Sequence, residues 1–309
     1  MSLVGRWQAF WFPAVPVRRL AAFRVVMTTF AFVDSWFVSG FISHYARVDG
    51  DFYHPLVLLR PLPRLGPEAT TVIHVVLCVS LAFAVVGLGT RLAMLVAAAL
   101  YLWWWATYYS FGAIHHGRIP IVVALFVMVV APAGRAYSLD SLLARRRAAR
   151  AGTPPPAEDA VDELAGWALR VMMVVVVLAY LLAAYAKLSV SGIGWITGGA
   201  LEAVMIQNGT AAAALIVHRS WAVTAMTGLT LLLEGSAWLL FLRGRARDAY
   251  VVAATLFHVG ALVVLNISFL GLVLAYLAFY DLEVGTARLG GWLRRRLPAE
   301  PGRELPLAR

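Results

Sequence analysis

Long apolar runs separated by short polar stretches dominate the pattern of this sequence. Eight runs are recognisable, at residues 17–38, 70–88, 91–112, 119–133, 166–187, 221–242, 249–265 and 268–282. A helix that crosses about 30 Å of hydrocarbon needs about 20 residues, so most of these runs are long enough to span a bilayer. The pattern therefore predicts an all-α, polytopic transmembrane helical bundle of about eight spans.

The composition agrees with a membrane protein rather than with a soluble one. Hydrophobic residues make up 61% of the chain and charged residues only 14%, whereas an ordinary soluble domain has about 25% charged residues. The net charge of +10 comes from arginines that flank the apolar runs. We therefore expect the basic residues to meet an anionic lipid bilayer and not nucleic acid. The expected location is a cell membrane, crossed several times, as in the inner membrane of a bacterium.

Basic residues are distributed unevenly between alternate loops. Arginines gather at 145–150, at 243–247 and in the tail 284–309, whereas most of the intervening loops are poorer in charge. The positive-inside rule then predicts that both termini are cytoplasmic. One membrane domain is expected over residues 1–283. It contains a cytoplasmic linker at 141–165 and an outer segment at 188–220, whose short helices lie on the surface or re-enter the membrane.

The basic residues comprise 25 arginines and a single lysine, Lys187. Arginine stays protonated in proteins, whereas a buried lysine amine can become neutral and act as a base. Lys187 shares one helix face with Tyr180, because the two residues lie two turns apart. The alternative is a lysine that snorkels to the lipid headgroups from a helix end.

Three further positions carry ionisable groups in or beside apolar runs. His115 and His116 precede the fourth run, where they are either acid–base groups or an interfacial polar turn. Glu234 and His258 lie inside the sixth and seventh runs, where a carboxylate must be paired, protonated or next to a cavity. These two residues could pair with each other. No metal site is expected, since the only cysteine is Cys78 and no cluster of ligands is spaced for a metal ion.

Two sequence motifs and their order resemble the HTTM family, the membrane domain of vitamin K-dependent gamma-carboxylase and its bacterial relatives. The first is Tyr185-Ala186-Lys187-Leu188 followed by Trp195, which is similar to the family's segment around its proposed lysine base. The second is His115-His116 followed by Ser138-Leu139-Asp140, with His116 at the position of the family's histidine. Phe257-His258 in the seventh run also fits, and the resemblance covers about residues 17–283.

The resemblance implies a reaction at the extracytoplasmic face. A lysine deprotonates a reduced naphthoquinone (vitamin K or menaquinone), oxygen adds, and the strong base so formed abstracts a proton from a glutamate side chain. Carbon dioxide then adds, which makes the enzyme a lyase. On this hypothesis Lys187 and His116 are catalytic, and the quinone contacts Tyr180, Tyr185, His115, Trp195, Glu234 and His258.

The sequence departs from the carboxylases in two respects. His-His replaces their Asn-His, and we do not expect the large soluble domain that binds their substrate. An enzyme is therefore one of three hypotheses. The second is a non-enzymatic membrane partner that binds a secreted peptide or helps to mature it through the outer segments. The third is a transporter, in which Glu234 and His258 form an intramembrane relay.

Overall fold

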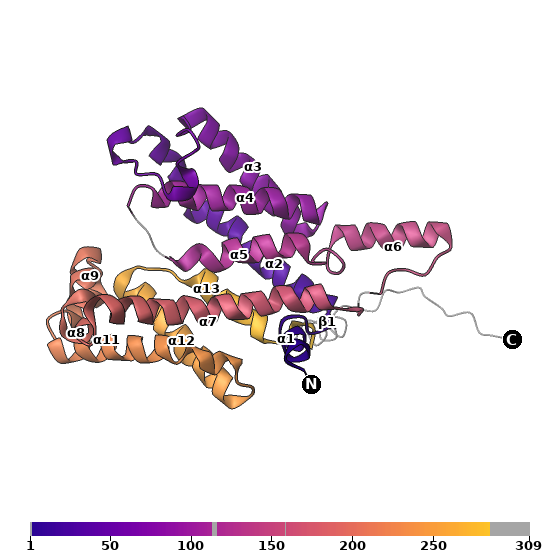
Figure 1. Ribbon diagram of the computed structural model, residues 1–309. Helices are drawn as coiled ribbons and strands as arrows, with labels where there is room; N and C mark the ends of the chain where they lie inside the picture. The colour runs from indigo at the N-terminus through magenta and orange to yellow at the C-terminus, as the bar shows by residue number, and fades with distance from the viewer. Residues whose placement is uncertain (1, 113–115, 158, 285–309) are drawn as a thin grey trace, which may run out of the picture.

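The computed structural model describes residues 2–112, 116–157 and 159–284, with the side chain of His116 outside that description. The described chain is helical apart from one pair of two-residue strands. Figure 1 shows two groups of helices, with the amino-terminal half above and the carboxy-terminal half below. Helix α7 (Glu163–Ser191) joins the groups by packing on α2 and α5 of the first and on α11 of the second.

The elements of the first half end before the second strand. They are α1 (Leu3–Trp11), β1 (Val15–Pro16), α2 (Val17–Val33), the π-helical turn η1 (Asp34–Val38), the 3-10 helices η2 (Gly40–Arg47), η3 (Gly50–Phe52) and η4 (Val57–Leu59), α3 (Pro67–Val86), α4 (Thr90–Tyr109), η5 (His116–Arg118), α5 (Ile119–Val130) and α6 (Leu139–Ala151).

The second half begins at the strand that pairs with β1. Its elements are β2 (Val161–Asp162), α7, the short helices α8 (Gly194–Thr197), α9 (Ala200–Asn208) and α10 (Ala211–Ile216), α11 (Ser220–Gly235), η6 (Ala237–Phe241), α12 (Arg245–Leu265), α13 (Leu270–Ala275) and η7 (Tyr276–Phe279).

Five helices of the described chain are long and apolar enough to cross a membrane. They are Val17–Val38, Pro67–Val86, Thr90–Tyr109, Glu163–Ser191 and Arg245–Leu265. The runs at 119–133 and 268–282 form shorter apolar helices, Ile119–Val130 and Leu270–Phe279. The run at 221–242 is divided, because α11 ends at Gly235 and η6 follows. The predicted multi-span helical protein is thus found, but a count of about eight spans is not confirmed, and the orientation of the termini remains a prediction.

A buried ion pair joins the helices of the first group at the end where η1 and η5 lie. Arg118 contacts Asp34 at 2.7 Å, and both side chains are almost fully buried. Tyr101 donates a hydrogen bond to the other oxygen of Asp34 at 2.9 Å, and the Arg118 guanidinium stacks 4.8 Å from the ring of Trp105. Asp34 is therefore more than a packing residue: it links α2, α4 and the start of α5.

The opposite end of this group is fixed by the turn between α3 and α4. Gly87 adopts a left-handed φ of 68°, and a Cβ there would lie 2.1 Å from the buried guanidinium of Arg24. Arg24 donates to the carbonyls of Ala84 and Tyr137, and Asp140 accepts from the amides of Gly89 and Thr90 at 2.9 and 2.8 Å. The loop before α6 is thus tied to the turn, which only glycine fits without strain.

Four elements were not predicted from the apolar runs. Strands β1 and β2 pair antiparallel, and α1 precedes them. Helix α6 occupies much of the predicted linker 141–165, since Ser138 caps its first turn and Gly152 ends it in a left-handed conformation. Its alanines and arginines have high helix propensity. Hydropathy does not detect such a helix because α6 is polar.

We predict that Asp140→Asn lowers the unfolding midpoint of the detergent-solubilised protein by removing charge-assisted hydrogen bonds, a loss of about 1–3 kcal/mol. Partial burial raises the pKa of Asp140, but the hydrogen bonds from Thr90 and Gly89 and the charge of Arg24 outweigh it and lower this pKa below 3.8. The stabilisation is therefore complete above that pH and is lost as the pH falls through the folded-state pKa. Asp159→Asn, in an exposed ion pair, is the control. Equal midpoints for the two variants would contradict the prediction.

Candidate functional site

The single lysine forms an ion pair with Glu234. Lys187, near the end of α7, donates to both carboxylate oxygens of Glu234, on the last turn of α11, at 2.7 and 2.8 Å. The side chains are only 21% and 7% exposed, and the lysine nitrogen lies 5.2 Å from the ring centroid of Trp195. Lys187 therefore turns inward to a counter-charge rather than outward to the headgroups.

A second polar cluster lies on the same wall. The Tyr180 hydroxyl is 2.5 Å from Nε2 of His258, and it also bonds the hydroxyl of Tyr276. Tyr250 stacks edge-on against Tyr180, with ring centroids 6.3 Å apart, and donates to the carbonyl of Leu233 at 3.0 Å. The pairing of Glu234 with His258 that the sequence allowed is not formed, because each residue has a nearer partner on α7.

Both clusters, apart from Tyr276, line one cavity of about 930 Å³. Its walls come from α7, α8, α9, α11 and α12, and most of its lining is apolar. The polar side chains Tyr180, Lys187, Thr230, Glu234, Tyr250 and His258 gather in this otherwise hydrocarbon-like space. Along α12 the lining extends from Ala246 to Leu265, about 28 Å at 1.5 Å per residue. The cavity therefore has room for a long, mostly apolar molecule with a few polar groups.

Five of the predicted site residues line the cavity, and Tyr185 does not. Tyr180, Lys187, Trp195, Glu234 and His258 all line the cavity. Tyr185, by contrast, is 67% exposed and is not part of the lining. The reason is helical geometry, since residues two apart on a helix point to nearly opposite sides.

For the adjacent histidines His115 and His116, the structure describes only the backbone of His116. His115 lies outside the described residues, and so does the side chain of His116. The backbone of His116 belongs to η5, which packs on α13. Phe269, directly before α13, lines the cavity, with its ring centroid 4.9 Å from that of His258. The backbone at residue 116 thus lies beside a helix whose preceding residue lines the cavity.

Tyr250 and Tyr276 were missed in the sequence. Tyr250 lies eight residues before His258 on α12, so its position on the same helix face was a usable signal. Tyr276 follows α13, and nothing in its local sequence distinguishes it from an interfacial aromatic residue.

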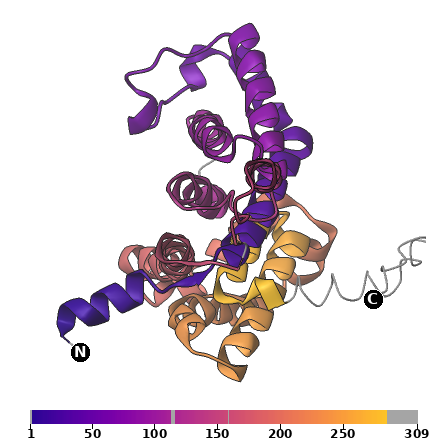
Figure 2. The same ribbon diagram turned by 90° about the vertical axis from the view of Figure 1, so that its right-hand side faces the viewer.

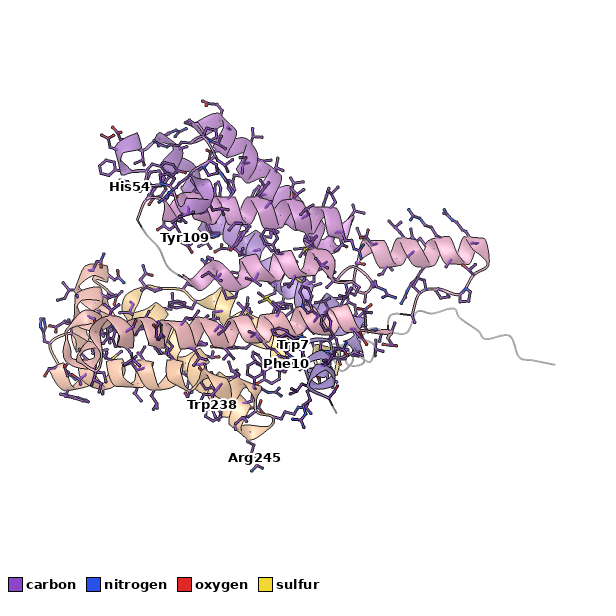
Figure 3. The ribbon with its side chains drawn as sticks, viewed as in Figure 1. Trp7, Phe10, His54, Tyr109, Trp238 and Arg245 are labelled. Atoms are coloured by element: carbon purple, nitrogen blue, oxygen red, sulfur yellow. The ribbon has the colours of Figure 1, made fainter. Side chains whose placement is uncertain are left out.

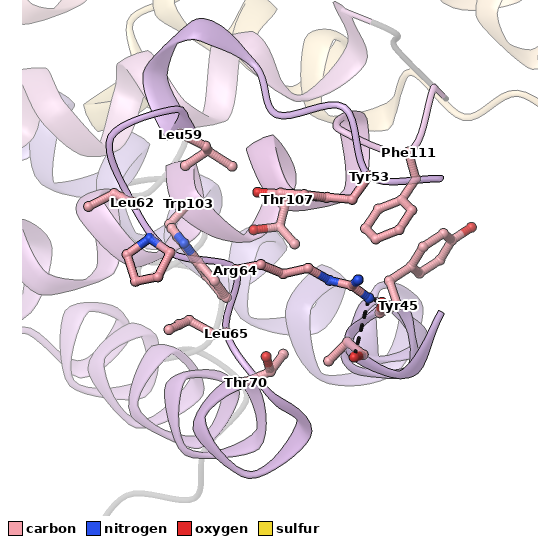
Figure 4. Close-up of a pocket in the computed structure, with 12 residues that line it drawn as sticks. Tyr45, Tyr53, Leu59, Leu62, Arg64, Leu65, Thr70, Trp103, Thr107 and Phe111 are labelled. Atoms are coloured by element: carbon pink, nitrogen blue, oxygen red, sulfur yellow. Dashed lines mark hydrogen bonds between the residues drawn. The ribbon is translucent and has the colours of Figure 1, made fainter. Parts of the chain in front are cut away.

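The segment between η1 and α3 lines a second, much smaller pocket, of about 10 Å³ (Figure 4). Arg64 fills this region, donating to the carbonyl of Tyr45 at 3.1 Å and to that of Val48, with its guanidinium 5.6 Å from the rings of Tyr53 and Phe111. The space is about that of one water molecule. Arg64 is therefore a structural residue of the loop. Its guanidinium group is bonded to backbone carbonyls and stacked on aromatic rings within the same region.

Comparison with protein families gives one match, to the HTTM domain over residues 12–281. No curated protein and no solved structure matches the chain. The match runs from the end of α1 to beyond η7, and so includes every residue that lines the large cavity. The chain belongs to the HTTM domain family of helical membrane proteins.

Proposed function

We propose that the protein uses the Lys187–Glu234 pair to move a proton to or from a lipid-soluble, reduced naphthoquinone held in the large cavity. The observation that carries the proposal is the only lysine of the chain, turned into an apolar cavity and bonded to a buried carboxylate. Family membership supports it through the resemblance to the vitamin K-dependent carboxylase membrane domain. Carboxylation of a glutamate side chain is the specific outcome that this resemblance suggests.

The cavity suits such a ligand in size and polarity. Sites for small molecules are typically about 300–1,000 Å³ and mostly apolar, with a few polar groups that fix orientation. This cavity has about 930 Å³ and two polar clusters. The aromatic side chains of Trp195, Phe257 and Phe269 can contact a flat ring, and a reduced naphthoquinone supplies such a ring with an acidic hydroxyl.

The ion pair can hold a proton in two arrangements. With the proton on nitrogen, Lys187 is an ammonium beside the Glu234 carboxylate. Transfer over 2.7 Å gives a neutral amine and a neutral acid with no change in net charge. Surroundings of low polarity reduce the energy difference between these states, because they disfavour isolated charge. A neutral Lys187 amine is then available as a base, and Glu234 is the group that receives its first proton.

The second cluster offers a separate donor and acceptor. Tyr180 bonds His258 at 2.5 Å and is also bonded by Tyr276. Such a phenol–imidazole pair can orient a ligand oxygen or take up a proton. The cavity thus presents two polar contacts to one ligand, one at Lys187 and one at Tyr180.

We predict that Lys187→Arg abolishes turnover of reduced menaquinone-4 by protein reconstituted in vesicles. Arginine keeps a positive charge beside Glu234 but does not supply a neutral amine. Loss of a general base costs about 10²–10⁴-fold in rate. Product formation is followed by chromatography, with and without a glutamate-containing peptide.

Tyr185→Phe is the matched control for Lys187→Arg, because it changes an exposed residue two positions away. Wild-type turnover in Lys187→Arg would exclude the lysine as base. If instead no variant of the cavity matters but changes in the loop 39–69, none of whose residues lines the cavity, abolish peptide maturation, the non-enzymatic partner hypothesis would hold.

We predict that Glu234→Gln increases the rate at which an amine reagent labels Lys187 at neutral pH. The carboxylate stabilises the ammonium form, and its removal leaves a larger fraction of reactive amine. Because the chain has one lysine, mass spectrometry of the labelled peptide measures this directly. The same rate in wild type and variant would mean that the ion pair is not formed in the membrane.

We predict that Gly260→Leu blocks binding of menaquinone-4 without unfolding the protein. Gly260 lines the cavity, and a Cβ added there meets nothing within 4 Å. The larger side chain therefore extends into the empty space and occupies it. Replacing a helical glycine also removes a destabilisation of about 1 kcal/mol, so the unfolding midpoint is not expected to fall. Unchanged binding, measured by quenching of tryptophan fluorescence, would place the ligand elsewhere.

A further inference from the structure

Helix α1 is held in a fixed place against the start of α7. Strand β1, which follows α1, pairs with β2, which precedes α7. Pro13 also packs closely on Gly166, where a Cβ would lie 1.6 Å from the Pro13 carbonyl oxygen. Phe10 contacts Phe241 of η6, with ring centroids 6.2 Å apart. Three separate contacts therefore determine where α1 lies.

This helix lies across the spans rather than along them. It is seen almost end-on beside α7 in Figure 1 and lengthwise in Figure 2, where its amino-terminal half extends away from the other helices. On that half Leu3, Val4 and Trp7 are 85%, 67% and 63% exposed. Residues 3, 4, 7, 10 and 11 share one helix face. An amphipathic helix of this kind lies in the plane of the membrane interface, with its apolar face in the lipid.

Two guanidinium groups without a counter-charge lie beside α1. Arg170, on the first turns of α7, stacks 4.7 Å over the ring of Phe10, and its Nε is buried without a hydrogen-bond partner. Arg243, in the connection from η6 to α12, is exposed and follows Phe241 by two residues. Because the ring of Phe10 contacts both Phe241 and the Arg170 guanidinium, the two arginines flank the same part of α1. Within the described chain neither has an acidic partner. An anion that lies between two such guanidinium groups would neutralise their charge.

We propose that Arg170 and Arg243 bind the phosphate of an anionic phospholipid whose acyl chains lie under the exposed apolar face of α1. The site combines two cations with the exposed apolar surface of α1. Figure 3 labels Trp7 and Phe10 on that surface, near the beginning of α7, and Arg245 at the beginning of α12. A basic pocket between membrane helices at an interface is a recurrent way of holding such headgroups. A small soluble anion would use the arginines but not α1.

The test compares lipids of opposite type in one detergent-solubilised preparation of the full chain. The unfolding midpoint is measured with equal mole fractions of dioleoylphosphatidylglycerol or dioleoylphosphatidylcholine in the micelles, and separately with inorganic phosphate. Ligands that bind only the folded state raise the midpoint. We expect phosphatidylglycerol to raise it by about 3 °C or more, and phosphatidylcholine and phosphate to have little effect.

The double variant Arg170→Gln/Arg243→Gln is expected to lose this preference for phosphatidylglycerol. Arg146→Gln/Arg147→Gln on α6 removes the same charge from two exposed residues and should keep it. If Arg170→Gln does not fold, Arg243→Gln alone decides, because Arg243 is exposed in a connection. Equal phosphatidylglycerol shifts in all variants would overturn the proposal, and so would an equal shift by inorganic phosphate, which would indicate a small-anion site.

Discussion

Burial of charge in a medium of low polarity is the constraint on which this structure depends. A single charge in hydrocarbon costs several kcal/mol, so buried charges pair with an opposite charge or, as Arg24 does, with backbone carbonyls. The two buried acids of the described chain follow this rule: Asp34 contacts Arg118, and Glu234 contacts Lys187. Each pair joins helices that are distant in sequence. The first fixes one end of the amino-terminal group, and the second connects α7 to α11 in the cavity wall.

The two pairs differ in what they leave available. Arg118 and Asp34 are closed in by Phe30, Tyr101 and Trp105, and arginine does not release its proton. The lysine pair instead lines a large apolar cavity, and its proton can reside on either partner. The same requirement for pairing thus produces a rigid structural contact at one position and a group with acid–base capability at another. This difference, more than the presence of charge itself, is why we assign the chemistry to Lys187.

Hydropathy was sufficient to predict the apolar helices because each is a local property of about 20 residues. The run at 17–38 has the same bounds as the observed helix. Hydropathy did not predict α1, which is short, or α6, which is polar. It also did not predict the break at Gly235 that divides one predicted span. The sequence also showed that the chain has a single lysine, and this residue does line the cavity. Tyr185, adjacent in the same motif, does not, because motif membership takes no account of helix faces.

The sequence by itself determined that the chain is a helical membrane protein and that one amine differs chemically from all its other basic groups. These properties follow from the composition of each segment and need no knowledge of its neighbours. Only the tertiary structure decided which groups meet. Lys187 finds Glu234 at a separation of 47 residues, and Tyr180 finds His258 at 78. These two contacts form because of how α7, α11 and α12 pack, and packing depends on all the contacting surfaces at once. No local pattern encodes that choice of partner.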